Sequence, residues 1–236
     1  MPDYSKRSTE IEIMDDLESS GEIIDVTLKE LESINLLLGG NYVTIDGISK
    51  LLSGTESERV VIADLGCGSG DILKLIRKHL QKKNIEAELI GIDANPNIVS
   101  YAAAHTAPGL NIHYEAVNIF SEEFKQREFD IIVGTLFFHH FTTEQLISFF
   151  SQLRNQVRIG IIINDIHRHW FAFHSIKWLT RIFSKSPMVI NDAPVSVMRA
   201  FKKAELREIV EKAGFRNYSI RWMWAFRWQV IIDMRS

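Results

Sequence analysis

The sequence predicts an α/β fold: a doubly wound, mostly parallel sheet of seven strands, with helices on both faces and an antiparallel hairpin at the C-terminus. Two observations support this prediction. From Val60 onward, short apolar runs alternate with stretches of helical periodicity, which is typical of parallel strands joined by crossover helices. Near the C-terminus, two apolar runs follow each other with no helix between them, and such neighbours pair antiparallel.

The first quarter of the chain predicts a helical cap. Apolar residues recur on one helical face within residues 21–40, and Gly39-Gly40 would end that helix. A second short helix is predicted over residues 44–52, before a polar loop at 53–59. The predicted division of the chain is therefore an N-terminal helical cap at 1–55 and a second domain at 56–236.

The elements of the second domain follow in alternation. Strands are predicted at residues 60–64, 87–93, 110–117, 129–134 and 157–166, and the final pair at 217–226 and 227–234. Helices are predicted at residues 70–83, 95–105, 143–155, 167–183 and 204–215. An aromatic helical insertion is expected over about residues 166–200.

Composition narrows the class of protein. The chain has 236 residues, of which 46% are hydrophobic and 24% charged, and its formal net charge is -3, so no overall basic field favours nucleic acid. Cys67 is the single cysteine, which rules out an internal disulfide framework and fits a reducing compartment. The first residues lack the apolar core of a secretory signal, and the apolar runs fall short of the roughly 20 residues that span a bilayer. We expect a cytoplasmic protein.

The turn after the first strand indicates the ligand. Asp64 ends the strand, and Gly66, Gly68 and Gly70 follow before a helical pattern begins. Glycine lets a ligand approach the backbone. A dinucleotide fingerprint would need a glycine where Asp71 stands, and an aspartate there is unfavourable beside a pyrophosphate.

The observed pattern D-x-G-x-G-x-G resembles motif I of the class I S-adenosylmethionine-dependent methyltransferases. The resemblance extends through four motifs over residues 60–165 and implies that S-adenosylmethionine is the cofactor. It implies that Asp93 accepts hydrogen bonds from both ribose hydroxyls, that Asn118 reads the adenine, and that Thr135 and Leu136 flank the methionyl end. The cofactor-binding residues expected are Asp64, Gly66, Cys67, Gly68, Gly70, Asp93, Ala94, Asn118, Ile119, Phe120, Thr135 and Leu136. Cys67 is expected as a small side chain within the turn and not as a nucleophile.

Three histidines are candidates for catalysis or acceptor contact. His139 and His140 follow the fourth predicted strand, and His167 follows the fifth, where parallel sheets bind ligands. A metal site formed by Asp165, His167, His169 and His174 is not expected, because His167 and His174 are two helical turns apart. No metal is predicted.

The aromatic helix admits three interpretations: a wall over an apolar acceptor, with Trp170 and His174 in contact; a surface that rests on a membrane; or core packing. Residues 191–201, "NDAPVSVMRAF", resemble a bacterial methyltransferase subgroup found beside type III polyketide synthases. This resemblance implies methyl transfer to a small apolar or aromatic acceptor, either phenolic, quinone-like or polyketide-derived. We expect the N-terminal helices to fold over the cofactor. Alternative hypotheses are methylation of tRNA or protein, a non-catalytic binding protein, and an NAD(P)-dependent reductase. The sequence leaves the oligomeric state open.

Overall fold

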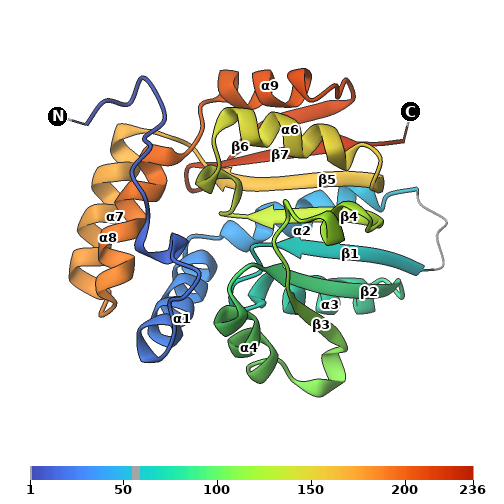
Figure 1. Cartoon of the computed structure of the whole chain (residues 1–236), viewed down its shortest axis with the longest axis horizontal. Helices are drawn as coiled ribbons and strands as arrows, with labels where there is room; N and C mark the ends of the chain where they lie inside the picture. Colours follow the sequence, from blue (N-terminus) through green and yellow to red (C-terminus); the bar gives the residue numbers. More distant parts are fainter. Residues whose placement is uncertain (1, 55–58, 236) are drawn as a thin grey trace.

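The computed structural model describes residues 2–54 and 59–235, so most of the predicted boundary at 53–59 lies outside the described residues. Its centre is a seven-stranded sheet with the order β3-β2-β1-β4-β5-β7-β6 (Figure 1). The strands are β1 (Arg59–Leu65), β2 (Glu86–Asp93), β3 (Ile112–Ala116), β4 (Phe129–Thr135), β5 (Val157–Ile166), β6 (Tyr218–Met223) and β7 (Arg227–Asp233). The first five strands are parallel, whereas β7 is antiparallel to both neighbours. The predicted fold class is confirmed.

Helices cover both faces of this sheet because near-continuous apolar strands must be buried on both sides. They are α1 (Glu22–Leu37), α2 (Gly40–Leu51), α3 (Asp71–Lys82), α4 (Pro96–Ala104), α5 (Glu122–Lys125), α6 (Thr143–Leu153), α7 (Trp170–Phe183), α8 (Pro187–Arg199) and α9 (Lys203–Lys212). Short 3-10 turns lie at Ile13–Asp15, Pro108–Leu110 and Phe138–His140. Among the described residues, no helix is both long enough and apolar enough to cross a membrane.

Two cores hold the layers together, one on each face of the sheet. On one face, Ile48 and Leu51 of α2 pack with Ile72 and Ile76 of α3 against β1, β4 and β5. On the other face, phenylalanines of α6 pack with apolar residues of α9. The helix α2 therefore belongs to the layers that cover the sheet.

The N-terminal helices depart from the predicted boundaries for a local reason. Gly39 adopts a left-handed conformation with φ 70°, which ends α1 in the usual manner, and Gly40 already belongs to α2. A side chain at Gly40 would approach Asn35 Oδ1 to 2.6 Å, so the close contact between the two helices requires glycine.

The region expected as one aromatic insertion consists of two helices. His169 caps the N-terminus of α7, and Ser186 caps α8 by accepting from the Val189 N–H. Both helices pack against each other at the carboxyl edge of the sheet, where α1 and the extended N-terminal segment also lie (Figure 1). This edge is the place where a parallel sheet binds ligands.

Candidate active site

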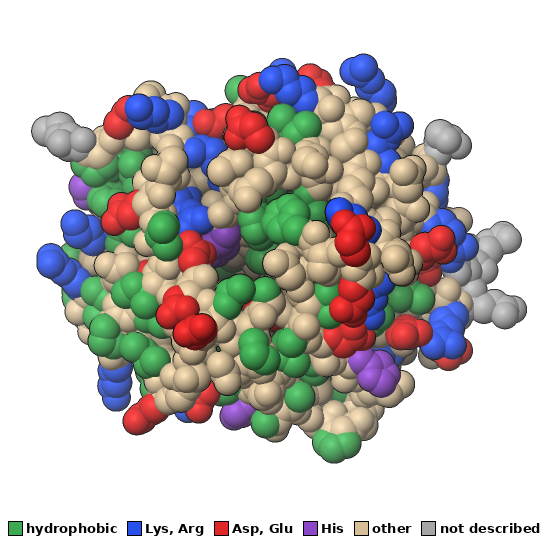
Figure 2. Space-filling view, in the orientation of Figure 1, with side chains coloured by type: hydrophobic (Ala, Val, Ile, Leu, Met, Phe, Trp, Pro, Cys, Tyr) green, Lys and Arg blue, Asp and Glu red, His purple; other side chains and the backbone are tan. Residues whose placement is uncertain are grey.

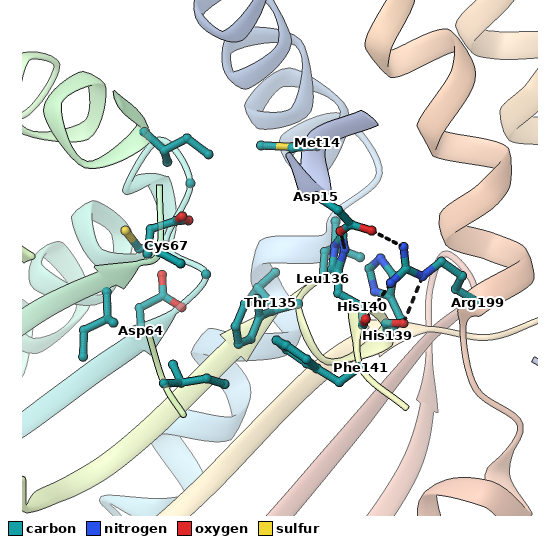
Figure 3. Close-up of a pocket in the computed structure, with 18 of the residues that line it drawn as sticks. Met14, Asp15, Asp64, Cys67, Thr135, Leu136, His139, His140, Phe141 and Arg199 are labelled. Carbon is teal, nitrogen blue, oxygen red and sulfur yellow. Dashed lines mark hydrogen bonds and ion pairs between the residues drawn. The ribbon is translucent and has the colours of Figure 1, made fainter. Parts of the chain in front are cut away.

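A cavity of about 990 Å³ opens at the carboxyl ends of β1, β2 and β4. Figure 2 shows a hollow in the centre of this face, with hydrophobic side chains around it and a histidine at its edge. The cavity has two halves, which face each other in Figure 3: the glycine turn with Asp64, and the histidines with Asp15 and Arg199. Eleven of the twelve predicted cofactor-binding residues line it, and the exception is Gly70.

The glycine turn is built by backbone hydrogen bonds and tight packing. The N–H groups of Gly66 and Cys67 donate to the Ile92 carbonyl, which ties the turn to β2. Gly68 has φ 51°, and a side chain there would meet only Leu28 at 3.8 Å, so its backbone faces open space in the cavity. Gly70 is different: an added Cβ would lie 2.1 Å from the Tyr114 hydroxyl oxygen, so packing explains this glycine.

Three carboxylates gather beside the turn, and none of them forms an ion pair within 4.0 Å among the described residues. Burial and the charges of Asp71 and Asp93 raise the pKa of Asp64 well above its usual range. Burial also raises the pKa of Asp71 to about 6 and raises the pKa of Asp93. Within the described residues, Asp64 Oδ1 and Asp71 Oδ2 are buried and have no hydrogen-bond partner. Such groups are costly unless a cation or a donor reaches them.

The next strand end supplies Asp93 and its neighbours. Asp93 Oδ1 accepts from the Asn95 N–H at 3.0 Å, which holds the carboxylate at the cavity wall. Asn118 is exposed, and its side-chain oxygen accepts from the Phe120 N–H at 2.9 Å in a local turn. That oxygen keeps a second lone pair for a ligand. Ile119 and Phe120 line the wall beside it.

The end of β4 presents backbone to the cavity. Leu136 has φ 55°, and its N–H donates to the Asn164 carbonyl at 2.8 Å. The Thr135 hydroxyl shares a hydrogen bond of 2.9 Å with the Thr44 hydroxyl of α2. These contacts fix the wall that joins the glycine turn to the histidines.

His139 is buried between two carboxylates. Its Nδ1 lies 2.8 Å from Asp165 Oδ1, and its Nε2 lies 3.5 Å from Glu12 Oε1. Burial opposes the charge, but Asp165 and Glu12 outweigh it and raise the pKa of His139 to about 9. The same pairing lowers the pKa of Asp165 and of Glu12 against the effect of burial. A histidine that holds its proton at neutral pH cannot accept one from an acceptor.

His140 is the histidine that remains at the cavity surface. Its side chain is 21% exposed, and its Nδ1 lies 2.5 Å from Asp15 Oδ1. The other oxygen of Asp15 accepts from Arg199 Nη1 at 2.5 Å. Burial would raise the pKa of Asp15, but the hydrogen bonds from His140 and Arg199 lower it strongly. Asp15 is therefore a carboxylate placed to accept a hydrogen bond from His140 Nδ1.

The residues that organise this half come from the extended N-terminal segment, which residue spacing alone could not reveal. Asp192 of α8 anchors the segment by accepting from the N–H groups of Ile13 and Met14, both at 2.9 Å. Arg7 donates to the carbonyls of His139 and Phe141 at 2.9 and 2.7 Å. We expected the N-terminal helices to cover the cofactor, which stays a prediction. The N-terminal residues that line the cavity lie mostly within residues 7–17, and α1 contributes Leu28, Leu31, Glu32 and Asn35 to the wall.

Three predicted residues lie outside the cavity. His167 packs at 4.8 Å between ring centroids against Trp228 and near Phe226, under the β6–β7 turn. Trp170 is 57% exposed on α7, and His174 is exposed on the same helix. The structure thus brings His139 and His140 to the cavity but places His167, Trp170 and His174 elsewhere.

Glu12, His139 and His140 place possible metal ligands within 4.8 Å of one another. The charges argue against a metal ion there. Arg199 Nη1 lies 3.6 Å from Glu12 Oε1, so a guanidinium already compensates the carboxylate. The proton on His139 adds a second positive charge to the same group.

The geometry agrees with comparisons to known proteins. Residues 62–160 match a family model described as a methyltransferase domain. This match confirms the predicted enzyme class, a methyltransferase. No curated protein sequence matches the chain.

Solved structures with the same fold include three methyltransferases. The plantazolicin methyltransferase BpumL, in complex with an analog and SAH, is 20% identical with a TM-score of 0.63, over 84% of this chain and 73% of that one. Human N-acetylserotonin methyltransferase in complex with SAM is 15% identical with a TM-score of 0.61, over 96% of this chain and 59% of that one. Magnesium protoporphyrin IX methyltransferase from Synechocystis PCC 6803, with SAH, is 17% identical with a TM-score of 0.52, over 82% and 84%. The compounds in those structures agree with the cofactor predicted for this chain.

Proposed function

We propose that this protein transfers a methyl group from S-adenosylmethionine to a small apolar or aromatic acceptor, either phenolic, quinone-like or polyketide-derived. The observation that carries the proposal is the division of one cavity into two chemically different halves. The half at the glycine turn has unpaired carboxylates, whereas the opposite half has apolar side chains around a histidine.

The residues of the first half fit the cofactor. A sulfonium and an ammonium would compensate Asp64 and Asp71, whose buried oxygens have no partner among the described residues. The open backbone at Gly68 would receive the carboxylate, and Asp93 would accept from the two ribose hydroxyls. When bound, the cofactor supplies an already activated methyl group, so the protein mainly orients the acceptor and excludes water.

The second half fits an apolar acceptor. Met14, Leu136, Phe137 and Phe141 line the cavity together with His140. Cavities with mostly apolar walls and few convergent polar groups bind small ligands. The three similar methyltransferases are named after chemically different compounds. The proposed acceptor class therefore rests on this wall and on the resemblance of residues 191–201 to the polyketide-associated subgroup.

His140 is the proposed base, positioned by Asp15. A phenol has a pKa near 10 by analogy with tyrosine, so its oxygen must lose a proton to become a strong nucleophile. Because Asp15 holds the Nδ1 proton, His140 Nε2 can take the acceptor proton and become an imidazolium beside a carboxylate. His139 stays protonated between Glu12 and Asp165 and serves to position the 3-10 turn that carries both histidines.

The proposal is tested by transfer of a labelled methyl group to a panel of phenols, quinones and alkylresorcinol lipids, with tRNA and a protein mixture as competing acceptors. We expect transfer to at least one small acceptor. His140→Gln should lower that rate at least about 100-fold, the lower end of general-base effects. Its affinity for S-adenosylhomocysteine should stay within twofold of the parent, which separates loss of the base from loss of the site.

The other hypotheses predict different results. Transfer only to tRNA or protein would overturn the acceptor class. A protein that does not bind S-adenosylhomocysteine in a calorimetric titration would be a non-catalytic scaffold, and one that binds NADH or NADPH instead would be a reductase. We expect neither dinucleotide to bind, because Asp71 follows the glycine turn where a pyrophosphate would lie.

A further inference from the structure

The helix α7 has a solvent-facing side that the proposed reaction does not use. One side of α7 packs against α8 at the edge of the molecule (Figure 1). On the other side, Trp170 is 57% exposed, Phe171 50%, Trp178 62% and Ile182 52%. Large apolar side chains at such exposure on one face mark an interaction surface.

The exposed side chains are sorted by charge along the helix. With 3.6 residues per turn, Phe171, Trp178 and Ile182 form an apolar row. Lys177 and Arg181, four residues apart, form a basic row beside it. Both cations are exposed. Figure 2 shows hydrophobic side chains alternating with Lys and Arg along the margin where α7 and α8 lie.

The apolar row continues onto the β6–β7 turn. The ring centroid of Phe171 lies 5.9 Å from that of Phe226, and Phe226 lies 6.1 Å from Trp222. Trp222 is 48% exposed, and Trp224 at the tip of the turn is 71% exposed. We call this surface the α7 face; it consists of Trp170, Phe171, Lys177, Trp178, Arg181, Ile182, Trp222 and Trp224.

We propose that the α7 face binds the surface of a membrane that contains anionic phospholipids. Charge supports this occupant: the fourteen residues of α7 include no Asp or Glu, although the whole chain has a formal net charge of -3. Lysine and arginine beside an apolar row, with exposed tryptophans, are the features of a helix that lies in the headgroup region. No described helix is apolar enough to cross the bilayer, so the contact is peripheral.

A second copy of the chain fits this surface less well. In a two-fold dimer the same patch faces itself, so Lys177 and Arg181 would approach their own copies. Like charges would be buried together at an interface from which lysine is usually excluded. An anionic lipid surface compensates the same two charges and accepts the apolar row without any complementary shape.

Vesicle flotation tests the proposal without methyl transfer. Vesicles of phosphatidylcholine and phosphatidylglycerol should bind the full chain, whereas pure phosphatidylcholine should bind it at least tenfold more weakly. Raising salt from 0.05 to about 0.5 M should weaken binding to the anionic vesicles, because the attraction is screened. Tryptophan fluorescence should shift to shorter wavelength on binding.

Two pairs of variants identify the surface. Lys177→Glu with Arg181→Glu should weaken binding to anionic vesicles at least tenfold, and Trp170→Ser with Trp178→Ser should do the same. The matched controls should leave binding unchanged: Lys78→Glu with Lys82→Glu has the same spacing on α3, and Tyr42→Ser changes a side chain that is 64% exposed on α2. Circular dichroism checks that each variant folds.

The proposal is overturned if the parent chain floats with neither kind of vesicle, or if the α7 variants bind as well as the controls. Light scattering that shows a dimer, lost in Trp170→Ser with Trp178→Ser, would assign the α7 face to a second copy instead. Each α7 variant should still bind S-adenosylhomocysteine. Vesicle binding and cofactor binding are then independent measurements, so the membrane proposal and the proposed reaction can fail separately.

Discussion

The two halves of the cavity handle charge in opposite ways. At the glycine turn, Asp64 is buried and Asp71 and Asp93 are half-buried, and the pKa of each carboxyl group is raised, mainly by burial. At the histidine half, Glu12 and Asp15 are each paired with histidine or Arg199, and their pKa values are lowered. Among the described residues, the carboxylates of the first half form no ion pair, whereas those of the second half do.

This contrast separates a site prepared for a cationic ligand from a site prepared for catalysis. Unpaired carboxylates gain most when a positive charge arrives, so the first half favours binding. Paired charges gain little from another cation, but the hydrogen bond from His140 Nδ1 to Asp15 fixes the orientation of the His140 ring at the cavity surface. On the proposed function, the histidine half contributes orientation and the glycine turn contributes affinity.

The largest expected effect breaks the paired half. His139→Leu should lower the free energy of unfolding by about 3–5 kcal/mol, because Glu12 and Asp165 stay buried without a partner. Urea unfolding measures this loss. The control His113→Leu changes an exposed histidine on β3 and should cost less than about 0.5 kcal/mol. Equal losses for both variants would show that the pairing at His139 contributes nothing.

The same pair predicts a pH dependence. The pKa of His139 is about 9 in the folded protein against an ordinary value of 6.5, so its stabilising contribution is fully present below pH 6.5 and is lost as pH rises through about 9. We expect unfolding midpoints of the parent to fall across that window. His139→Leu should show a flatter profile there, and parallel profiles would refute the raised pKa.

The next effect breaks the unpaired half. Asp93→Ala should weaken binding of S-adenosylhomocysteine by about 100-fold, since two hydrogen bonds to a charged acceptor are lost at about 1.5 kcal/mol each. Isothermal titration calorimetry measures the affinity. Glu86→Ala, an exposed acid at the opposite end of β2, is the control. An unchanged affinity for Asp93→Ala would remove the diol contact and with it the proposed orientation of the cofactor.

Binding of a cationic cofactor should release a proton from the half of the cavity at the glycine turn. Because burial raises the pKa of Asp71 to about 6, a cationic ligand that lowers it again should displace part of a proton at pH 6. S-adenosylmethionine titrated in two buffers of different ionisation enthalpy should reveal this release, and its affinity should weaken below pH 6. Asp71→Asn should reduce the release at pH 6, and the remainder would come from Asp64 and Asp93, whose pKa values are also raised. S-adenosylhomocysteine lacks the sulfonium and should release less.

The smallest effect concerns the glycine outside the cavity wall. Gly70→Ala should destabilise the fold by about 1–3 kcal/mol, because φ is 72° and the new Cβ meets the Tyr114 hydroxyl. Removing that hydroxyl with Tyr114→Phe in the same chain should recover part of the loss. Cofactor affinity of the refolded variant should stay within about threefold of the parent. A selective loss of affinity with unchanged stability would return Gly70 to the binding residues.

Local pattern was sufficient for the sheet and for the first half of the site. Alternating apolar runs and helices predicted the five parallel strands and the final antiparallel pair, because burial on both faces leaves that periodicity in the sequence. Asp64 and Asp93 lie at the carboxyl ends of predicted parallel strands, and the glycine turn follows the first of them. Their place at the carboxyl edge of the sheet therefore follows from their position in the sequence. The helix α8 was missed because the aromatic residues before it obscured a boundary that the Ser186 cap sets.

The second half was decided by tertiary structure. Asp15 meets His140 across 125 positions of sequence, and Glu12 meets His139 through a segment with no regular pattern of its own. Adjacent residues His139 and His140 could not be ranked from the sequence, since one is buried between carboxylates and the other reaches the cavity only because Arg7, Asp192 and Arg199 hold the N-terminal segment there. Periodicity records which residues are buried, but the partner of a buried charge is set by packing between distant segments.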